Sequence, residues 1–582
     1  MTPLPIKQAR RTISILTLAL LASCGGSGDD GGASSTTPYL GTLLNGPSCS
    51  LKYYAQSQPA PRIGTDPYYS RQWYLKNTGI LSGYSGLVSG EDLQIENAWT
   101  AGYKGQGVRV ALLDDGLEVT HADLAPNIVE GASYNYVSDD TWKRGSPWPL
   151  PCTKDFDHGT AVGGVIAARD NNGIGGHGVA PRASLVGYNA LLSDEDRDVL
   201  DAMVRDKNKN DIYNNSWGAS DNGHFNAPTS GTAHINTILE GIRNGRNGRG
   251  VIYTFAAGNG GHLGDYSALD GNVSVLGAIP VCATNASGLR APYSEPGPNL
   301  IVCAPSSDLG AGRSALPDVM TTGLQNEYRE DFNGTSAATP MVSGVIALML
   351  QANPNLTWRD VPLILAKSAR QVDPGNAGWT RYGGYHYNHE YGFGVANATA
   401  AVQLARGWES VGGSSTLKQC GPYAVNVGQP IPETTPVSDT ELLNPFTHAS
   451  ALNQPAVGGL SSKVRLSGCN IQHIEHIDVT VTATDSTGNQ PHPSAGDLQI
   501  TLTSPSGQSS TLTTPHPCYS DEGTAQQQIP CMGLVNFSFG VNRHLDEPAT
   551  TSTSSDWTLS AADRRTGNTG RLKNWSITFY GR

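Results

Sequence analysis

The sequence predicts two domains of different class, an α/β domain built on a parallel sheet followed by an all-β sandwich. In the first part of the chain, short apolar runs alternate with helical patterns, and this strand-then-helix order is typical of a parallel sheet. From about residue 416, short strands with alternating patterns are separated by turn-rich loops. A chain of 582 residues is also too long for one core. We expect the α/β domain at 59–407, a linker at 408–440 and the sandwich at 441–582.

The α/β domain is predicted from short apolar strands that each end in polar or Gly-rich sequence. The strands are expected at residues 108–113, 183–188, 212–216 and 251–256. His158 opens a run of small residues at 161–168, which predicts a helix that packs closely against the sheet. In parallel α/β sheets the ligand site lies beyond the carboxyl ends of the strands. We therefore expect the functional residues in the polar turns that follow the strands.

The sandwich is predicted from short stretches in which apolar and polar residues alternate with a period of two. These stretches lie at residues 477–482, 497–502, 535–539, 557–559 and 575–580. No long helical run interrupts them, so we expect a separate all-β domain.

The N-terminus is predicted to be a targeting segment. Basic residues precede an apolar run at 13–22, which is too short to span a membrane as a mature helix. The run ends in Leu-Ala-Ser-Cys, which resembles a bacterial lipoprotein signal with Cys24 as the acylated residue; an ordinary cleaved signal peptide is the alternative. The predicted parts are a signal peptide at 1–23 and a flexible tether at 24–58. We expect membrane contact through this lipid anchor only, in the bacterial cell envelope (outer membrane or surface), or a secreted protein.

Charge and cysteine content limit the partners and the compartment. The net charge of −12 argues against nucleic acid and fits cationic ligands or metal ions, although solubility alone explains it equally well. The chain has nine cysteines. Without Cys24 eight remain, an even number that suits four disulfides in an oxidising compartment. The sequence does not determine their connectivity, but Cys282–Cys303 and Cys518–Cys531 are the pairs most easily predicted.

Ser336 is the first candidate for a reactive residue. It lies in the heptapeptide Gly-Thr-Ser-Ala-Ala-Thr-Pro, which is predicted as a turn directly before an apolar helical run at 341–350. At a helix N-terminus, free N–H groups and the helix dipole favour developing negative charge, which suits a nucleophile. Small residues crowd many turns, so this string alone is weak evidence.

Three further residues complete a candidate catalytic set. Asp114 follows a buried strand and can orient an imidazole, and His158 at a helix start can act as general base. Asn259 follows another strand, and its amide can donate to an oxyanion. Taken singly, such a His is usually a cap and such an Asp a turn former. In the order Asp, His, Asn, Ser they predict a serine nucleophile with its partners.

From Thr65 onward the chain resembles the subtilisin-fold serine endopeptidases, and among them the kexin/furin-like proprotein convertases. The resemblance rests on Asp-Pro-Tyr-Tyr-Ser-Arg-Gln-Trp-Tyr-Leu at 66–75, Leu-Asp-Asp-Gly-Leu-Glu at 113–118, His-Ala-Asp-Leu at 121–124, Asn-Ser-Trp-Gly-Ala-Ser-Asp at 215–221 and Gly-Asn-Gly-Gly at 258–261, and in the sandwich on His-Pro-Ser-Ala-Gly-Asp-Leu at 492–498 and Ser-Pro-Ser-Gly at 504–507. It implies a subtilisin-like α/β domain, a jelly-roll P-domain as the sandwich, and an Asp114–His158–Ser336 triad with Asn259 as the oxyanion donor.

The resemblance also implies protein or peptide substrates with basic residues. Asp115 and Asp155 would face the substrate residue two before the cleaved bond. Asp221 and Asp270 would line the primary pocket, which takes the Arg or Lys immediately before that bond. Buried carboxylates favour a paired cation, and a guanidinium can bind them in a bidentate manner. The alternative is that these acids hold calcium or solvate loops.

Calcium is the implied cofactor, at two sites. Hard oxygen donors suit Ca²⁺, and the first site would use the side chains of Asp66, Asp123 and Asn172 with the backbone carbonyls of Arg169, Ile174 and Gly176. The second, behind the primary pocket, would use Asp221, Asp265 and Glu295. The alternative for the Asp-Asn-Asn-Gly loop at 170–173 is a simple turn.

Two departures from the family pattern bear on function. Asn226 and Ala227 stand near the place where the family has acids that bind a basic substrate residue four before the cleaved bond. Selectivity could therefore relax to dibasic or single basic sites. The segment before the α/β domain is too short for an inhibitory prodomain, so the protein either folds without one or uses a separate folding helper. We predict a calcium-dependent serine endopeptidase; a broad degradative protease and a non-catalytic surface-anchored binding protein are the alternatives.

Overall fold

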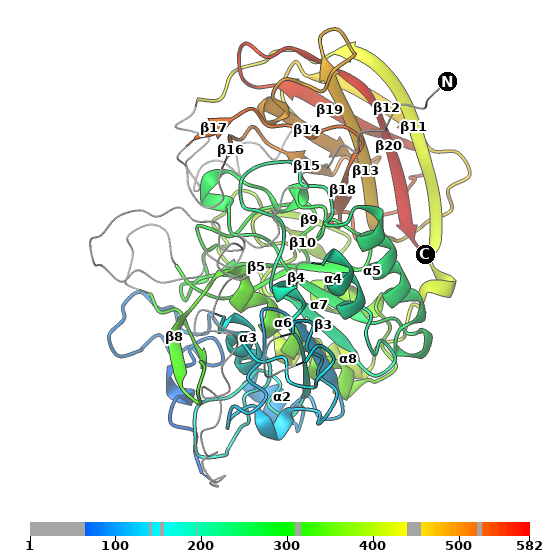
Figure 1. The fold of residues 1–582 in the computed structure, drawn as a ribbon. Helices are drawn as coiled ribbons and strands as arrows, with labels where there is room; N and C mark the ends of the chain where they lie inside the picture. The colour runs from blue at the N-terminus through cyan, green and yellow to red at the C-terminus, as the bar shows by residue number, and fades with distance from the viewer. Residues whose placement is uncertain are drawn as a thin grey trace, which may run out of the picture.

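The computed structural model describes residues 64–138, 143–151, 156–193, 195–308, 316–438, 455–520 and 527–582. It confirms the predicted fold class, an α/β domain followed by an antiparallel sandwich (Figure 1). In Figure 1 the sandwich, drawn in yellow to red, lies above the α/β domain. The predicted signal peptide, the tether and Cys24 lie outside the described residues.

A six-stranded parallel sheet forms the centre of the α/β domain. Its strand order is β2-β1-β3-β4-β5-β6. The strands are β1 (Arg109–Leu113), β2 (Ser184–Tyr188), β3 (Ile212–Asn215), β4 (Ile252–Ala256), β5 (Ala278–Thr284) and β6 (Val302–Pro305). The first four match predicted strands. All six are almost completely buried, because helices cover both faces of a parallel sheet.

The described part of the α/β domain contains the helices α2 (Glu96–Thr100), α3 (His158–Ala167), α4 (Asp196–Ala202), α5 (Thr232–Asn244), α6 (Gly334–Ala352), α7 (Asp360–Ser368) and α8 (Ala398–Arg406). Two short hairpins accompany them, β7 (Val319–Thr322) with β8 (Tyr328–Phe332) and β9 (Thr380–Tyr382) with β10 (Tyr385–Tyr387). Among the described helices, α6 alone is long and apolar enough to cross a membrane, yet 89% of its apolar window is buried inside the domain. It is therefore the core helix.

Neighbouring residues of β4 show how the two faces of the sheet are covered. Successive side chains of a strand point to opposite faces. The Tyr253 hydroxyl donates to the carbonyl of Met203, and a Cβ on Gly241 of α5 would clash with this ring. The Thr254 hydroxyl instead lies 2.7 Å from the Ser343 hydroxyl of α6. Helices α5 and α6 therefore pack against opposite faces of the sheet.

The sandwich consists of two four-stranded sheets with the orders β11-β20-β13-β18 and β12-β19-β14-β15. Their strands are β11 (Lys418–Pro430), β12 (Leu460–Arg465), β13 (Ile474–Asp485), β14 (Leu498–Thr503), β15 (Ser509–Thr513), β18 (Phe537–Val541), β19 (Asp556–Asp563) and β20 (Gly570–Gly581). A short pair, β16 (Cys518–Tyr519) with β17 (Gln528–Ile529), lies beside them. The segment 408–440, predicted as a linker, contains β11, which pairs with β20 along its length.

Three disulfides join described cysteines. Cys282–Cys303 links the neighbouring strands β5 and β6, and Cys518–Cys531 closes the β16–β17 segment. Both predicted pairs are therefore confirmed. A third bond, Cys420–Cys469, was not predicted; it fixes β11 to the sandwich.

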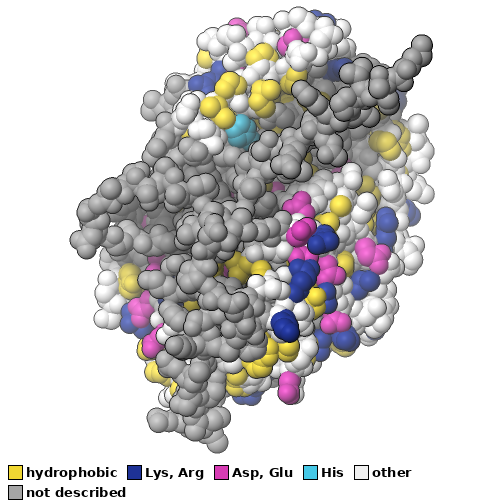
Figure 2. All heavy atoms as spheres, viewed as in Figure 1, with side chains coloured by type: hydrophobic (Ala, Val, Ile, Leu, Met, Phe, Trp, Pro, Cys, Tyr) yellow, Lys and Arg dark blue, Asp and Glu magenta, His cyan; other side chains and the backbone are white. Residues whose placement is uncertain are grey.

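A buried ion pair joins the two domains. The guanidinium of Arg359, next to α7, binds both carboxylate oxygens of Glu475 in β13 at 2.7 Å. Its Nη1 also donates to backbone carbonyls that lead into the sandwich. On the face drawn in Figure 2, acidic and basic side chains are interspersed over the α/β domain, so the net negative charge is not gathered into one patch there.

Candidate active site

The predicted catalytic residues meet at the carboxyl ends of the parallel strands. Asp114 directly follows β1, and Asn259 follows β4 by three residues. The N-terminal ends of α3 and α6 bring His158 and Ser336 to the same edge of the sheet. Side chains from four segments of the sequence converge there because parallel strands end at one edge.

Asp114 and His158 form a close pair. The Nδ1 atom of His158 lies 2.8 Å from Oδ1 of Asp114. Both side chains are buried, and the same Oδ1 accepts the backbone N–H of Asp115. The ring of Phe332 in β8 packs edge-on against the imidazole, with centroids 5.4 Å apart. A Cβ on Gly159 would clash with the backbone beside Asp114, so only glycine allows this approach of α3.

Ser336 lies in the first turn of α6, and its place follows from its neighbours. Gly334 opens the helix with φ = 77°, a conformation that favours glycine. Pro340 has no N–H, so it cannot donate to the carbonyl of Ser336 one turn earlier in the helix. Ser216 supplies that donor: its hydroxyl donates to the Ser336 carbonyl, and the Ser336 hydroxyl donates to the Ser216 carbonyl, each at 3.1 Å.

The side-chain amide of Asn259 is held in one orientation. Its Oδ1 accepts the backbone N–H of Thr335 at 2.8 Å and the Thr335 hydroxyl at 3.0 Å. With the oxygen occupied, the Nδ2 group is the part that remains to donate at the N-terminus of α6. The amide is thus oriented as a donor in the region where the helix already favours negative charge.

The two carboxylates predicted for the primary pocket lie near each other, Asp221 buried and Asp270 half-buried. Asp221 accepts the backbone N–H of Asn259 at 3.0 Å, and Asp270 accepts the backbone N–H of Ala219 at 2.7 Å. Burial raises the pKa of Asp270 to about 6, and the nearby charge of Asp221 adds to this rise. Carboxylates in such a site gain much from a paired cation.

Asp115 has a role that the sequence did not predict. Its two oxygens accept the backbone N–H groups of Gly159 at 2.8 Å and of His158 at 3.3 Å. Asp115 therefore accepts hydrogen bonds from two free N–H groups at the start of α3. This fixes the backbone of His158, the residue that pairs with Asp114. The place of Asp115 facing the substrate stays a prediction. Asp155, predicted beside it, lies outside the described residues.

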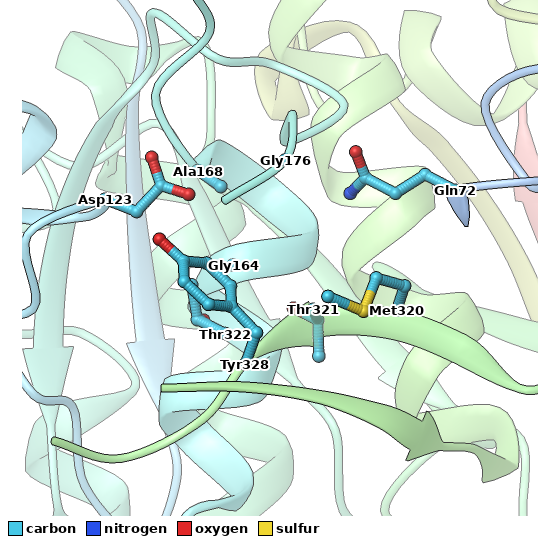
Figure 3. A pocket seen from close by; sticks show the side chains of 9 residues that line it. All are labelled: Gln72, Asp123, Gly164, Ala168, Gly176, Met320, Thr321, Thr322 and Tyr328. Atoms are coloured by element: carbon cyan, nitrogen blue, oxygen red, sulfur yellow. The ribbon is translucent and has the colours of Figure 1, made fainter. Parts of the chain in front are cut away.

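Two residues of the first predicted calcium site, Asp123 and Gly176, line a small cavity (Figure 3). The cavity of about 10 Å³ has room for one small ion or water molecule, and Asp123, Gly176 and Tyr328 are among its lining residues. Burial raises the pKa of Asp123 to about 7. Its Oδ2 atom has no hydrogen-bond partner among the described residues, although the Tyr328 hydroxyl points toward the carboxylate (Figure 3). An unpaired buried carboxylate oxygen fits a hard cation.

The other residues of the first predicted calcium site form hydrogen bonds that hold the loop at 170–173 in place. Asp66 accepts the backbone N–H groups of Asn172 and Gly173 and contacts Nε2 of His177 at 2.8 Å. The side-chain amide of Asn172 donates to Asp123, and the N–H of Ile174 donates to Asn172. Arg169 donates its backbone N–H to the carbonyl of Asp123. The structure thus brings all six predicted residues into one neighbourhood.

The second predicted site is a cluster of three buried carboxylates directly behind Asn259. Burial raises the pKa of Asp265 to about 7 and that of Glu295 well above its usual range, and it also raises the pKa of Asp221. Glu295 accepts the N–H of Gly260 at 2.9 Å, and a Cβ on Gly258 would clash with its carboxylate. Three acids buried this close together fit a divalent cation.

Residues that support the site from behind were missed in the sequence. Ser216 and Thr335 orient the nucleophile and the amide through hydrogen bonds, and neither pattern is visible without the fold. Pro340 was the available signal: a proline inside an apolar helix leaves one carbonyl without its usual donor.

Comparison with known proteins agrees with this geometry. Residues 105–394 match the family model described as Subtilase family, and residues 474–579 match that of the Proprotein convertase P-domain. Human neuroendocrine convertase 2 is 33% identical over 478 residues, which cover 80% of this chain and 68% of that protein. A PC3-like endoprotease, variant B, of Hydra vulgaris is 33% identical over 480 residues, which cover 82% of this chain and 62% of that protein.

Further relatives come from fission yeast and from solved structures. The dibasic-processing endoprotease of Schizosaccharomyces pombe is 30% identical over 523 residues, covering 89% of this chain and 65% of that protein. The crystal structure of the serine protease of Aeromonas sobria has a TM-score of 0.73 and 27% identity, covering 92% of this chain and 99% of that one. A complex of that protease with a chaperone matches equally well, with a TM-score of 0.73 over 91% of this chain and 97% of the protease. The chain belongs to the subtilase family of serine proteases, in the group that carries a proprotein convertase P-domain.

Proposed function

We propose that the protein is a serine endopeptidase that hydrolyses peptide bonds after Lys or Arg. The observation that carries this proposal is the 2.8 Å pair of Asp114 and His158 at the edge of the sheet where the first turn of α6 carries Ser336, together with the acids Asp221 and Asp270. The first group supplies the chemistry and the second the preference for a cation. The names of the relatives, neuroendocrine convertase and dibasic-processing endoprotease, support the same substrate class.

The reaction is acyl transfer by these side chains. His158 accepts the Ser336 hydroxyl proton through Nε2 as Oγ attacks the scissile carbonyl, while Asp114 holds Nδ1 and stabilises the imidazolium. The oxyanion accepts hydrogen bonds from Nδ2 of Asn259 and from the free N–H groups of α6. One such donor lowers the barrier by roughly 2.7–4 kcal/mol. His158 then gives its proton to the leaving amine, and water hydrolyses the acyl-enzyme by the reverse path.

The proposed selectivity is for basic residues, with a preference for dibasic sites. Asp221 and Asp270 would pair with the side chain before the cleaved bond, and Asp115 and Asp155 with the one before that. Asn226 lies near the place where a further acid was expected. Its side-chain amide donates to the carbonyl of Ser220, so it supports the loop that follows β3 instead.

The experiment compares wild type with Ser336→Ala on a peptide library randomised around a single Arg or Lys. Wild type is expected to cut after basic residues, and S336A is expected to lose all turnover while keeping its melting temperature. Turnover retained by S336A contradicts the triad. Cleavage after neutral residues at equal rates contradicts the proposed pocket.

Calcium is proposed as the cofactor because both acid clusters fit it. Asp66, Asp123 and Asn172 with the carbonyls of Arg169, Ile174 and Gly176 would hold one ion, and Asp221, Asp265 and Glu295 the other. A bound ion supplies positive charge that neutralises the buried carboxylates. Asp221 accepts the backbone N–H of Asn259. The second group of acids therefore also helps to fix the position of Asn259, whose side-chain amide would donate to the oxyanion.

We further propose that Cys24 carries a lipid anchor in the cell envelope and that a separate protein assists folding. The Leu-Ala-Ser-Cys sequence supports the anchor, and the Aeromonas protease–chaperone complex supports the helper. Cys24→Ser is expected to move the protein from the membrane fraction to the soluble fraction; an unchanged distribution contradicts the anchor. Refolding of the purified chain to full activity without other proteins contradicts the need for a helper. The α/β domain limits 59–407 remain our proposal, and we place the start of the sandwich before residue 441, at β11 within the predicted linker.

A further inference from the structure

Part of the α/β domain is built into the hydrophobic core of the sandwich. Four buried residues of the α/β domain pack in the same cluster as the sandwich core: Phe225, Tyr266, Ala268 and Leu269. The ring of Phe225 lies edge-on to Phe537 at 5.5 Å and to Phe539 at 6.3 Å, both in β18. The short turn Ser267–Leu269 also lies against β18. These anchors are not scattered, because they flank the acids of the proposed primary pocket.

The sequence positions make the connection explicit. Phe225 follows Asp221 by only four residues, and Leu269 directly precedes Asp270. Each acidic side chain is therefore carried on a loop whose apolar anchor is buried in the other domain. Because the anchors and the acids share short loops, movement at β18 moves both carboxylates.

The backbone between Asp221 and Phe225 is also bound by the sandwich. The N–H of Tyr519 donates to the carbonyl of Asn222 at 3.0 Å, and Nε2 of His516 lies 2.8 Å from the carbonyl of Gly223. A Cβ on Gly223, whose φ is 78°, would clash with the carbonyl of Pro517. On its other side, Gly223 donates its N–H to Asp265 at 2.8 Å. The loop is therefore held between the sandwich and the acid cluster.

We propose that the sandwich is a positioning element of the primary pocket: His516 and Phe537 hold the loop of Asp221, and β18 holds the turn before Asp270, so that both carboxylates reach one basic side chain. This inference rests on the proposed selectivity for basic residues. Two neighbouring carboxylates repel each other, so their loops relax apart unless packing holds them. A cation gains most when both partners are already in place. A sandwich that only stabilised the fold would leave this affinity unchanged.

The first test separates positioning from stability with two matched substitutions. Phe537→Leu removes the ring that packs on Phe225. Phe579→Leu makes the same change in the sandwich core at β20, where the ring packs on Trp557 at 5.0 Å. Both are made in an S336A background, and the probe is p-aminobenzamidine, a planar cation, measured by fluorescence titration. We expect F537L to weaken binding about tenfold and F579L to leave it within about twofold, at comparable losses in melting temperature.

The second test uses the polar contact of His516. In the tautomer with its proton on Nε2, His516 donates to the Gly223 carbonyl; His516→Gln keeps a side-chain donor there, whereas His516→Leu removes it. On an Arg peptide amide, H516L is expected to raise KM several-fold with kcat little changed, and H516Q to keep most of the wild-type KM. A purely structural role predicts that H516L lowers the melting temperature more than H516Q does, without a split between KM and kcat in either variant.

The outcomes distinguish the two proposals. If the S336A protein with its native sandwich does not bind the probe, the basic pocket itself is refuted. If it binds the probe, and F537L and F579L bind it equally, the basic pocket stands and the positioning role is refuted. If H516L keeps the wild-type KM, the His516 contact is excluded from the positioning element.

Discussion

At the residue scale, the half-buried carboxylate of Asp270 is expected to give a pH dependence that is separate from that of His158, the proposed base. Its pKa is raised to about 6, mainly by burial, so the carboxylate is lost as the pH falls through that value. We expect the ratio of kcat/KM for an Arg peptide to that for a matched neutral peptide to fall below about pH 6. Because His158 acts on both peptides, its titration cancels in the ratio. A ratio that stays constant from about pH 8 down to about pH 5, the range in which a histidine titrates, contradicts the role of Asp270.

Asp114, His158, Asn259 and Ser336 could be proposed as a set because each follows a recognisable strand or lies near the start of a recognisable helix, whereas Asp221 and Asp270 were proposed from the family resemblance. The contacts that orient these side chains could not be predicted. The Nδ2 group of Asn259 is left to donate because Thr335, distant in sequence, occupies its oxygen. Asp115 caps α3 because β1 and α3 meet at one edge of the sheet. Such contacts depend on distances between segments, which a single sequence does not contain.

At the element scale, the predicted helix at 341–350 is the second half of α6, which begins at Gly334. The segment before it was predicted as a turn, because its small residues are typical of turns. The helix extends across Pro340 since Ser216 satisfies the carbonyl that the proline leaves free. A tertiary contact overrides local propensity here, and the nucleophile therefore lies within the helix and not before it.

Pro340→Ala tests this arrangement. Alanine restores an N–H that can bond to the Ser336 carbonyl and compete with the Ser216 hydroxyl. We expect the variant to be at least as stable as wild type in urea unfolding, while kcat falls about tenfold because Ser336 loses its fixed partner. Pro354→Ala is the control, because it makes the same change just beyond the other end of α6 and is expected to leave kcat unchanged. An unchanged kcat in P340A contradicts the link between the proline and the nucleophile.

At the scale of the whole molecule, the fold class was predicted correctly, but the linker was not recognised as containing a strand. The stretch 418–430 includes several Gly and Pro residues, yet it forms β11 because Tyr423, Val425 and Val427 alternate onto the sandwich core. The contacts between the two domains could not be predicted from the sequence either, since the buried Arg359–Glu475 pair joins residues 116 positions apart.

The two acid clusters predict that calcium holds the α/β domain together. Without the ion, Asp123 and the group of Asp221, Asp265 and Glu295 are buried anions that favour unfolding or protonation. Chelation is expected to lower the melting temperature and the activity together, and added Ca²⁺ to restore both as its concentration rises. Mg²⁺ is the control, because it prefers a smaller octahedral shell. A melting temperature that does not change with Ca²⁺ contradicts both sites.

The burial of Phe225 and Leu269 in the sandwich core has a consequence for the order of events during synthesis and export. The sheet that carries β18 also contains β20, the last described strand, which lies between β11 and β13. That sheet cannot close until residues up to 581 have been made. The loops of Asp221 and Asp270 therefore gain their apolar support only after β20 has been synthesised, long after the proposed nucleophile Ser336.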